Sequence, residues 1–94
     1  MWKVKIHKKA QKAVKRHPLV IKSFNSLLND LAQYGPQLTW WSHFGKLRNG
    51  SRLFHCHLNN NSPVMIALWM VVNEEKRELE VKDVQTHQEF DSKN

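Results

Sequence analysis

The order of apolar and polar residues predicts a short strand followed by two helices in the first part of the chain. Residues 2–7 alternate between apolar and polar side chains, which is typical of a half-buried strand. From Lys8 the apolar residues take a helical spacing, and Pro18 should end or bend that helix because proline has no backbone N–H to donate. A second helix is predicted from Pro18 to Tyr34, where apolar residues recur every three or four positions. The Gly-Pro pair that follows should end it.

The second half of the chain is predicted to form three strands. Residues 52–58 and 78–84 alternate, the latter with one slip, whereas residues 64–72 are almost continuously apolar. Asn, Ser, Pro and charged residues between these segments are typical of turns. Residues 36–45 are expected to form a loop, and the tail from Thr86 is short and mostly polar.

These elements indicate an α+β fold of order β-α-α-β-β-β. We expect an antiparallel sheet of three to four strands with the two N-terminal helices packed on one face. The chain has 94 residues, a length typical of one compact domain, so residues 1–94 are expected to form a single domain.

Charge is the unusual feature of the composition. Residues 1–52 contain eleven Lys and Arg but one acidic residue, a net charge of +10, whereas residues 53–94 carry a net charge of −3. The overall charge is +7 with a pI near 9.9. Such a balance favours a polyanionic partner, either nucleic acid or an acidic protein. The content of 40% hydrophobic residues with three Gly and three Pro excludes disordered and collagen-like classes.

Other features indicate a cytoplasmic protein without a membrane partner. A single cysteine, Cys56, cannot form an internal disulfide, which suits a reducing compartment. The N-terminus is charged from Lys3 onward and lacks the apolar segment of a signal peptide. The longest apolar run, residues 64–72, is too short to cross a bilayer.

The stretch from Lys46 combines cations with two histidines and is the first candidate site. His55 and His57 share one face of a predicted strand, because side chains on a strand alternate. If Phe54 points to the core, these histidines point outward, with Lys46 and Arg52 expected nearby. Cations can hold a phosphate and an imidazole can move protons near neutral pH, which suits phosphodiester chemistry. The alternative is a half-solvated basic strand with two incidental histidines.

Other side chains have weaker functional signals. His55-Cys56-His57 contains zinc or copper ligand types, but alternation puts Cys56 on the other face and no further ligands complete a site, so neither a metal nor a cofactor is expected. Free cysteine is more often a small buried hydrophobe than a nucleophile. Structural roles are expected for His7, His17 and His43.

The remaining aromatic and basic residues leave alternatives open. Either of Trp40 and Trp41 could stack on a base, although one of them is expected to be buried, and Trp2 and Trp69 are expected in the core. The lysine-rich segment from Lys8 forms either a solvated face or a phosphate-binding face without base recognition.

Four motifs occur in order along the chain. They are Tyr34-Gly35-Pro36, Trp41 with Phe44-Gly45-Lys46-Leu47, His55-Cys56-His57-Leu58, and Thr86-His87-Gln88-Glu89-Phe90-Asp91. Together they resemble the RelE/ParE superfamily of bacterial toxins. The last motif is similar to the Gly-Thr-His-x-Glu-Tyr-Asp close of RelE-, HigB- and YafQ-like members.

This resemblance implies a toxin of a type II toxin–antitoxin system with one RelE-like domain. Such a toxin enters the ribosomal A site, where it meets 16S rRNA, and cleaves mRNA there without a metal ion. The ribose 2′-OH attacks the adjacent phosphate and leaves a 2′,3′-cyclic phosphate and a 5′-OH. A cognate antitoxin binds and neutralises the toxin. The alternatives are an RNA-binding domain without cleavage and a ParE-like inhibitor of DNA gyrase.

The resemblance also implies which residues act. His87 and His57 match catalytic histidines, and Arg52 and Lys46 match cations at the scissile phosphate. Phe90 stands where many relatives have Tyr, so it can stack on a base but cannot supply a proton, and Gln85 replaces the usual Gly before Thr-His. With the basic segment of the first helix, the residues expected to bind RNA are Lys46, Arg48, Arg52, His55, Lys82, Phe90, Lys8, Lys9 and Lys12.

Overall fold

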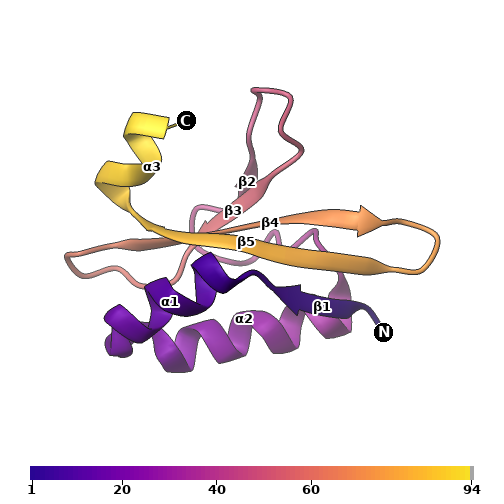
Figure 1. Cartoon of the computed structure of the whole chain (residues 1–94), viewed down its shortest axis with the longest axis horizontal. Helices are drawn as coiled ribbons and strands as arrows, with labels where there is room; N and C mark the ends of the chain where they lie inside the picture. The colour runs from indigo at the N-terminus through magenta and orange to yellow at the C-terminus, as the bar shows by residue number, and fades with distance from the viewer. Residues whose placement is uncertain (94) are drawn as a thin grey trace.

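A computed structural model describes residues 1–93 of the chain (Figure 1). The predicted order of the first helices and of the later strands is confirmed. The elements are β1 (Lys3–Ile6), α1 (Lys8–Arg16), the 3-10 helix η1 (Pro18–Val20), α2 (Ile21–Tyr34), β2 (Gly45–Lys46), β3 (Phe54–His57), β4 (Met65–Asn73), β5 (Glu78–Thr86) and α3 (His87–Lys93).

The strands of this part of the chain form one five-stranded sheet in the order β1-β5-β4-β3-β2. The α+β class is confirmed, but the expectation of a fully antiparallel sheet of three to four strands is not. β1 runs parallel to β5, because two helices separate β1 from the other strands and no hairpin sets its direction. β2 pairs antiparallel with β3 over two residues, which is too short for alternation to be visible in the sequence.

One face of the sheet is covered by α1 and α2, and the opposite face carries α3 (Figure 1). The β2–β3 hairpin also rises on the side of α3 (Figure 1). Apolar side chains from both helices and from alternate strand positions form the core between the sheet and α1–α2. Its fully buried members include Leu27, Leu31, Leu38, Cys56, Ala67, Trp69, Leu79 and Val81.

Local sequence explains where the first helices begin and end. The His7 side chain accepts a hydrogen bond from the backbone N–H of Lys9 and so caps the start of α1. Gly35 ends α2 with a φ of +83°, a conformation that favours glycine. A Cβ at Gly35 would lie 2.7 Å from Nε1 of Trp2, so glycine also lets this indole pack over the end of α2.

The segment after Thr86 forms the helix α3, where a polar tail was expected. The Thr86 hydroxyl accepts a hydrogen bond from the Glu89 backbone N–H at 3.1 Å. In return, the Glu89 carboxylate accepts one from the Thr86 backbone N–H at 2.9 Å. This reciprocal pair is a capping box, and its signature Thr-x-x-Glu is present in the sequence at 86–89.

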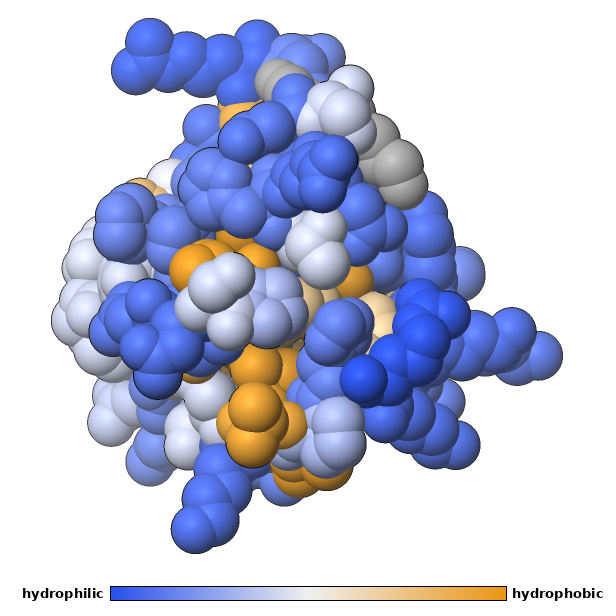
Figure 2. Space-filling view, turned by 90° about the vertical axis from the view of Figure 1, so that its left-hand side faces the viewer, coloured by the Kyte–Doolittle hydropathy of each residue, from blue (hydrophilic) through white to orange (hydrophobic). Residues whose placement is uncertain are grey.

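Apolar side chains also reach the surface at the end of the molecule where α1 meets α2. Leu19 is 96% exposed and Ile21 is exposed beside it. Figure 2, which views this end, shows an apolar area surrounded by hydrophilic side chains. In residues 1–93, no helix is both long and apolar enough to span a membrane.

Candidate active site

Histidines from three separate segments meet on the sheet face that carries α3. The rings of His43 and His57 stack, with centroids 3.9 Å apart and planes inclined by 14°. The ring of His87 meets His57 edge-on, at 5.7 Å and 80°. His55 lies on the same face of β3 as His57, and its ring centroid is 5.2 Å from that of Phe90 in α3. We call His43, His55, His57 and His87 the histidine cluster.

The β2–β3 hairpin brings His43 to His57. Gly45 pairs with His55, and the Leu47 N–H donates to the Leu53 carbonyl at 2.9 Å, so the hairpin turns around Gly50. Further along, the His57 N–H donates to the carbonyl of the residue before His43 at 2.8 Å. His43 has a φ of 56°, which is uncommon for a residue with a side chain and occurs preferentially at functional sites.

Gly45 makes room for the His55 imidazole. A Cβ at Gly45 would lie 2.9 Å from Nε2 and 3.1 Å from Cε1 of His55, closer than a Cβ atom normally approaches another heavy atom. The ring of His55 therefore lies over the backbone of β2 on one side and against Phe90 on the other.

An acidic residue orients His87. Asp91 lies one helical turn further along α3, and its Oδ2 is 2.9 Å from Nδ1 of His87. A carboxylate accepts hydrogen bonds, so Nδ1 carries the hydrogen in this pair. The Nε2 atom is then the one that can exchange a proton with a bound molecule.

Burial lowers the pKa of two members of the cluster. The pKa of His57 is lowered mainly by desolvation, and then by repulsion from His43, His87 and His55. Desolvation is also the main reason that the pKa of His55 is lowered, although a backbone hydrogen bond with His43 opposes it. Both imidazoles are therefore neutral at pH 7, so His57 can accept a proton there.

Buried residues beneath the cluster explain this desolvation. Ile66 lies opposite His57 in the sheet and Leu68 lies opposite His55, and both aliphatic side chains are buried. In the next strand the buried Asp83 and Gln85 occupy the same rows. The site therefore has a partly apolar floor.

Gln85, which replaces the Gly of the family pattern, belongs to a buried polar group. Its Nε2 donates to Oδ2 of Asp83 at 2.9 Å, and the ammonium of Lys9 lies 3.3 Å from the same oxygen. The Oε1 atom of Gln85 is buried without a hydrogen-bond partner. Lys9 thus pairs with a buried carboxylate, which gives it a structural contact in addition to its predicted role in RNA binding.

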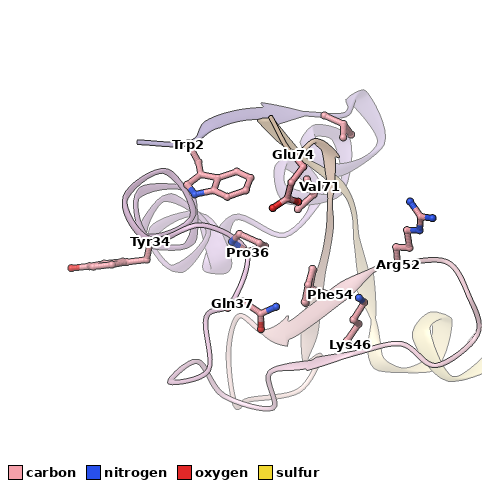
Figure 3. A pocket seen from close by; sticks show the side chains of 10 residues that line it. Trp2, Tyr34, Pro36, Gln37, Lys46, Arg52, Phe54, Val71 and Glu74 are labelled. Carbon is pink, nitrogen blue, oxygen red and sulfur yellow. The ribbon is translucent and has the colours of Figure 1, made fainter. Parts of the chain in front are cut away.

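The structure does not bring Lys46 and Arg52 to the histidines. Lys46 pairs with Phe54 and so shares its face of the sheet, and its ammonium lies 5.3 Å from the centre of the Phe54 ring. Both cations line a cleft on this opposite face, together with residues of α2 and β4 (Figure 3). The expectation that they lie beside His55 and His57 is corrected, because cross-strand partners point to the same side of a sheet.

The other predicted RNA contacts are distributed over the surface. Arg48 is exposed in the hairpin, and Lys8 and Lys12 are exposed on α1. Lys82 on β5 forms an ion pair with Glu80 at 2.7 Å. No contact of these residues tests RNA binding, so that role stays a prediction.

Metal and thiol chemistry have little support in the described part of the chain. Residues 1–93 contain no group of three or more His, Cys, Asp or Glu side chains arranged to hold a metal ion. Cys56 is buried on the core side of β3, and burial raises its pKa to about 12. Its thiol is therefore protonated at neutral pH and is a poor nucleophile.

His43 is the site residue that the sequence prediction missed. The sequence predicts a loop at residues 36–45 and a structural role for His43, because a loop position does not show which residues its side chain faces. The available signal was Asn49-Gly50, a dipeptide typical of hairpin turns. A hairpin centred on Gly50 puts position 43 opposite position 57.

Comparisons with known proteins show the fold. No protein-family profile and no curated protein matches the chain. A chain of the archaeal RelE–RelB complex from Pyrococcus horikoshii superposes with a TM-score of 0.71 at 20% identity, covering 90% of this chain and 93% of that one. YafQ from E. coli gives 0.72 at 12% identity, covering 96% and 98%. A chain of the YoeB–YefM toxin–antitoxin complex from Staphylococcus aureus gives 0.68 at 13%, covering 93% and 98%. The chain has the RelE-like fold, as its motifs predicted.

Proposed function

We propose that this protein is the toxin of a type II toxin–antitoxin system and cleaves mRNA on the ribosome by attack of a ribose 2′-OH on the adjacent phosphate. One observation carries the proposal: His43 and His87 converge on His57 from separate segments, on an accessible face of a strongly basic protein. Two proton-transfer groups side by side are what this reaction requires, because one proton is removed and another is added.

The geometry suggests a role for each histidine. Neutral His57 takes the proton from the 2′-OH as its oxygen forms a bond to phosphorus. His87, oriented by Asp91, gives a proton to the 5′-oxygen as the bond between that oxygen and phosphorus breaks. The products are a 2′,3′-cyclic phosphate and a 5′-OH. His43, stacked on His57, holds that ring in place and, when protonated, stabilises the negative charge that develops on the phosphate.

Phe90 and several exposed cations suit RNA binding. Phe90 lies against His55 at the edge of the cluster, where an aromatic ring can stack on a base. Arg48, Lys8 and Lys12 are exposed cations that we propose contact mRNA or 16S rRNA phosphates. Lys46 and Arg52 line the cleft on the opposite face of the sheet. We therefore assign the positive charge that stabilises the scissile phosphate to protonated histidines of the cluster.

We also propose a cognate antitoxin as the protein partner. Two of the similar structures are described as complexes, RelE–RelB and the YoeB–YefM toxin–antitoxin. A basic surface with exposed apolar residues is suited to binding a protein that covers it.

Induced expression followed by primer extension on cellular mRNA tests the proposal. We expect new 5′ ends within translated messages for the unaltered chain and for His17→Gln, whose histidine lies outside the cluster, and none for His57→Ala. Arrest of translation with intact message would contradict it. RNA binding that survives in His57→Ala together with unchanged message would favour the alternative of a non-cleaving RNA-binding domain, and a DNA-damage response would favour gyrase inhibition.

A further inference from the structure

The cleft on the helix-covered face is a second candidate for binding, separate from the histidine cluster. It has a volume of about 580 Å³ and is bounded by the end of α2, the end of β4 and the β2–β3 hairpin (Figure 3). Its lining residues are Trp2, Tyr34, Pro36, Gln37, Lys46, Arg52, Phe54, Val71, Val72 and Glu74.

The cleft combines an apolar floor with unneutralised cations. Trp2, Phe54 and Val71 supply aromatic and aliphatic surface. Neither Lys46 nor Arg52 forms an ion pair with a carboxylate among residues 1–93. The Lys46 ammonium instead lies over the Phe54 ring. An occupant that brings both a carboxylate and an apolar side chain would satisfy both features.

Exposed aromatic residues extend this surface beyond the cleft. Tyr34, at its edge, packs edge-on against Trp40 with ring centroids 5.3 Å apart, and these side chains are 59% and 58% exposed. A hydrogen bond of the next residue explains why Trp40 is exposed. Trp41 turns inward and donates its Nε1–H to Asp30 at 2.8 Å, which leaves Trp40 on the surface. Trp, Tyr and Arg are the residues that dominate binding energy at protein interfaces.

We infer that the cleft and the adjoining Tyr34–Trp40 pair bind an acidic segment of a partner protein that also carries a large apolar side chain. The carboxylates would lie at Lys46 and Arg52, and the apolar side chain would enter between Trp2 and Phe54. The inference rests on the proposed function only in assigning this partner to the antitoxin.

A protein segment fits better than RNA. Glu74 lines the cleft on the β4 side and would repel a phosphate backbone, whereas a peptide can place its acidic residues on the opposite side only. RNA held in this cleft would also lie across the sheet from His57 and His87. The partner would thus have a point of attachment that leaves the histidine cluster uncovered.

Fluorescence anisotropy with a labelled peptide tests the inference. The probe alternates Glu and Leu with one central Trp, and its control has Gln in place of every Glu. We expect the full chain to bind the acidic probe at least tenfold more tightly than the control, and Arg52→Glu and Trp40→Ala each to weaken binding at least tenfold. Lys15→Glu makes the same charge change on an exposed part of α1 and should bind as the unaltered chain does.

Several outcomes would overturn the inference. One is equal loss of affinity in Lys15→Glu and Arg52→Glu, which would indicate attraction by net charge alone. Another is displacement of the probe by a single-stranded RNA oligonucleotide, with RNA binding that depends on Trp40, which would make the cleft an RNA site. Unfolding curves of each variant show whether a loss reflects misfolding.

The result can be separated from the proposed function. Tyr34→Ala removes part of the cleft but no residue proposed for cleavage. It should therefore lower the affinity for the probe and leave mRNA cleavage unchanged. If mRNA stays intact with every variant while the probe still depends on Arg52, the cleavage proposal fails and the binding cleft stands. If cleavage is confirmed and the probe does not bind, only the cleft fails.

Discussion

The two faces of β3 differ in chemistry, although the residues of both faces come from the same four-residue strand. Phe54 and Cys56 are buried members of the hydrophobic core. His55 and His57 point to the other face, where α3 covers them only in part. The core face therefore determines stability, whereas the histidine face holds polar groups over a thin buried layer that lowers the pKa of two imidazoles. Substitutions on the two faces should separate these effects.

Like the loss of His57, His87→Ala belongs to the largest expected effects on activity. Loss of a general acid should reduce mRNA cleavage by about 10²- to 10⁴-fold. The unfolding free energy should change little, because the side chain is exposed. Cleavage rates and urea unfolding of the same preparation measure both. Gln88→Ala, at the next exposed position of α3, serves as the control, and an equal loss of activity there would indicate that helix integrity matters rather than the imidazole.

Leu31→Ala should show the opposite behaviour. Leu31 is fully buried in α2, so truncation leaves a cavity and should lower the unfolding free energy by about 2–5 kcal/mol. Cleavage per folded molecule should be unchanged, since the core does not touch the substrate. Urea unfolding gives the stability, and cleavage assayed below the transition gives the activity. A loss of activity without a loss of stability would contradict the separation of the two faces.

Gly45→Ala should affect the histidine face more gently. The added Cβ would meet the His55 ring at 2.9 Å, so the imidazole must shift. We expect the unfolding free energy to fall by about 1 kcal/mol, a small loss for a substitution that overpacks a site. Because His55 contacts Phe90 and repels protonated His57, we expect weaker RNA binding and a change in the pH dependence of cleavage. A pH–rate profile measures this. A profile that matches the unaltered chain would show that His55 does not act on the site.

The smallest expected effect is the pH dependence of stability. The folded chain lowers the pKa of His57, so as the pH falls below about 6.5 the unfolded chain gains a proton that the folded chain resists. Stability is therefore lost toward acid pH and is fully present above about pH 7. Urea midpoints between pH 8 and pH 5 should fall less steeply in His57→Gln. Burial lowers the pKa of His55 as well, so the slope should be reduced in His57→Gln rather than abolished.

Much of the fold could be predicted from local patterns. The spacing in α2 and the alternation in β3 and β5 reflect burial on one side, which a sequence shows directly. The direction of β1 could not be predicted in this way, because its partner β5 lies at the other end of the chain. The helix α3 was missed although its Thr-x-x-Glu capping box is visible in the sequence.

The candidate site could be predicted only in part, because some of its contacts depend on how distant segments pair. Alternation correctly placed His55 and His57 on one face, and the family pattern drew attention to His87, which the structure places against His57. The contact of His43 and the orientation of Lys46 depend on the register of the β2–β3 hairpin. Register is a property of the pairing and not of either strand alone, so neither could be deduced from periodicity.

Analysis of the cut ends tests the central claim most directly. Purified chain is incubated with ribosomes translating a defined mRNA, and the fragments are examined for 2′,3′-cyclic phosphate and 5′-OH ends. We predict these ends for the unaltered chain and for His17→Gln, and no fragments for a folded His57→Ala. Fragments with 5′-phosphate ends, or cleavage by His57→Ala at the rate of the unaltered chain, would contradict the assignment of the histidine cluster as the active site.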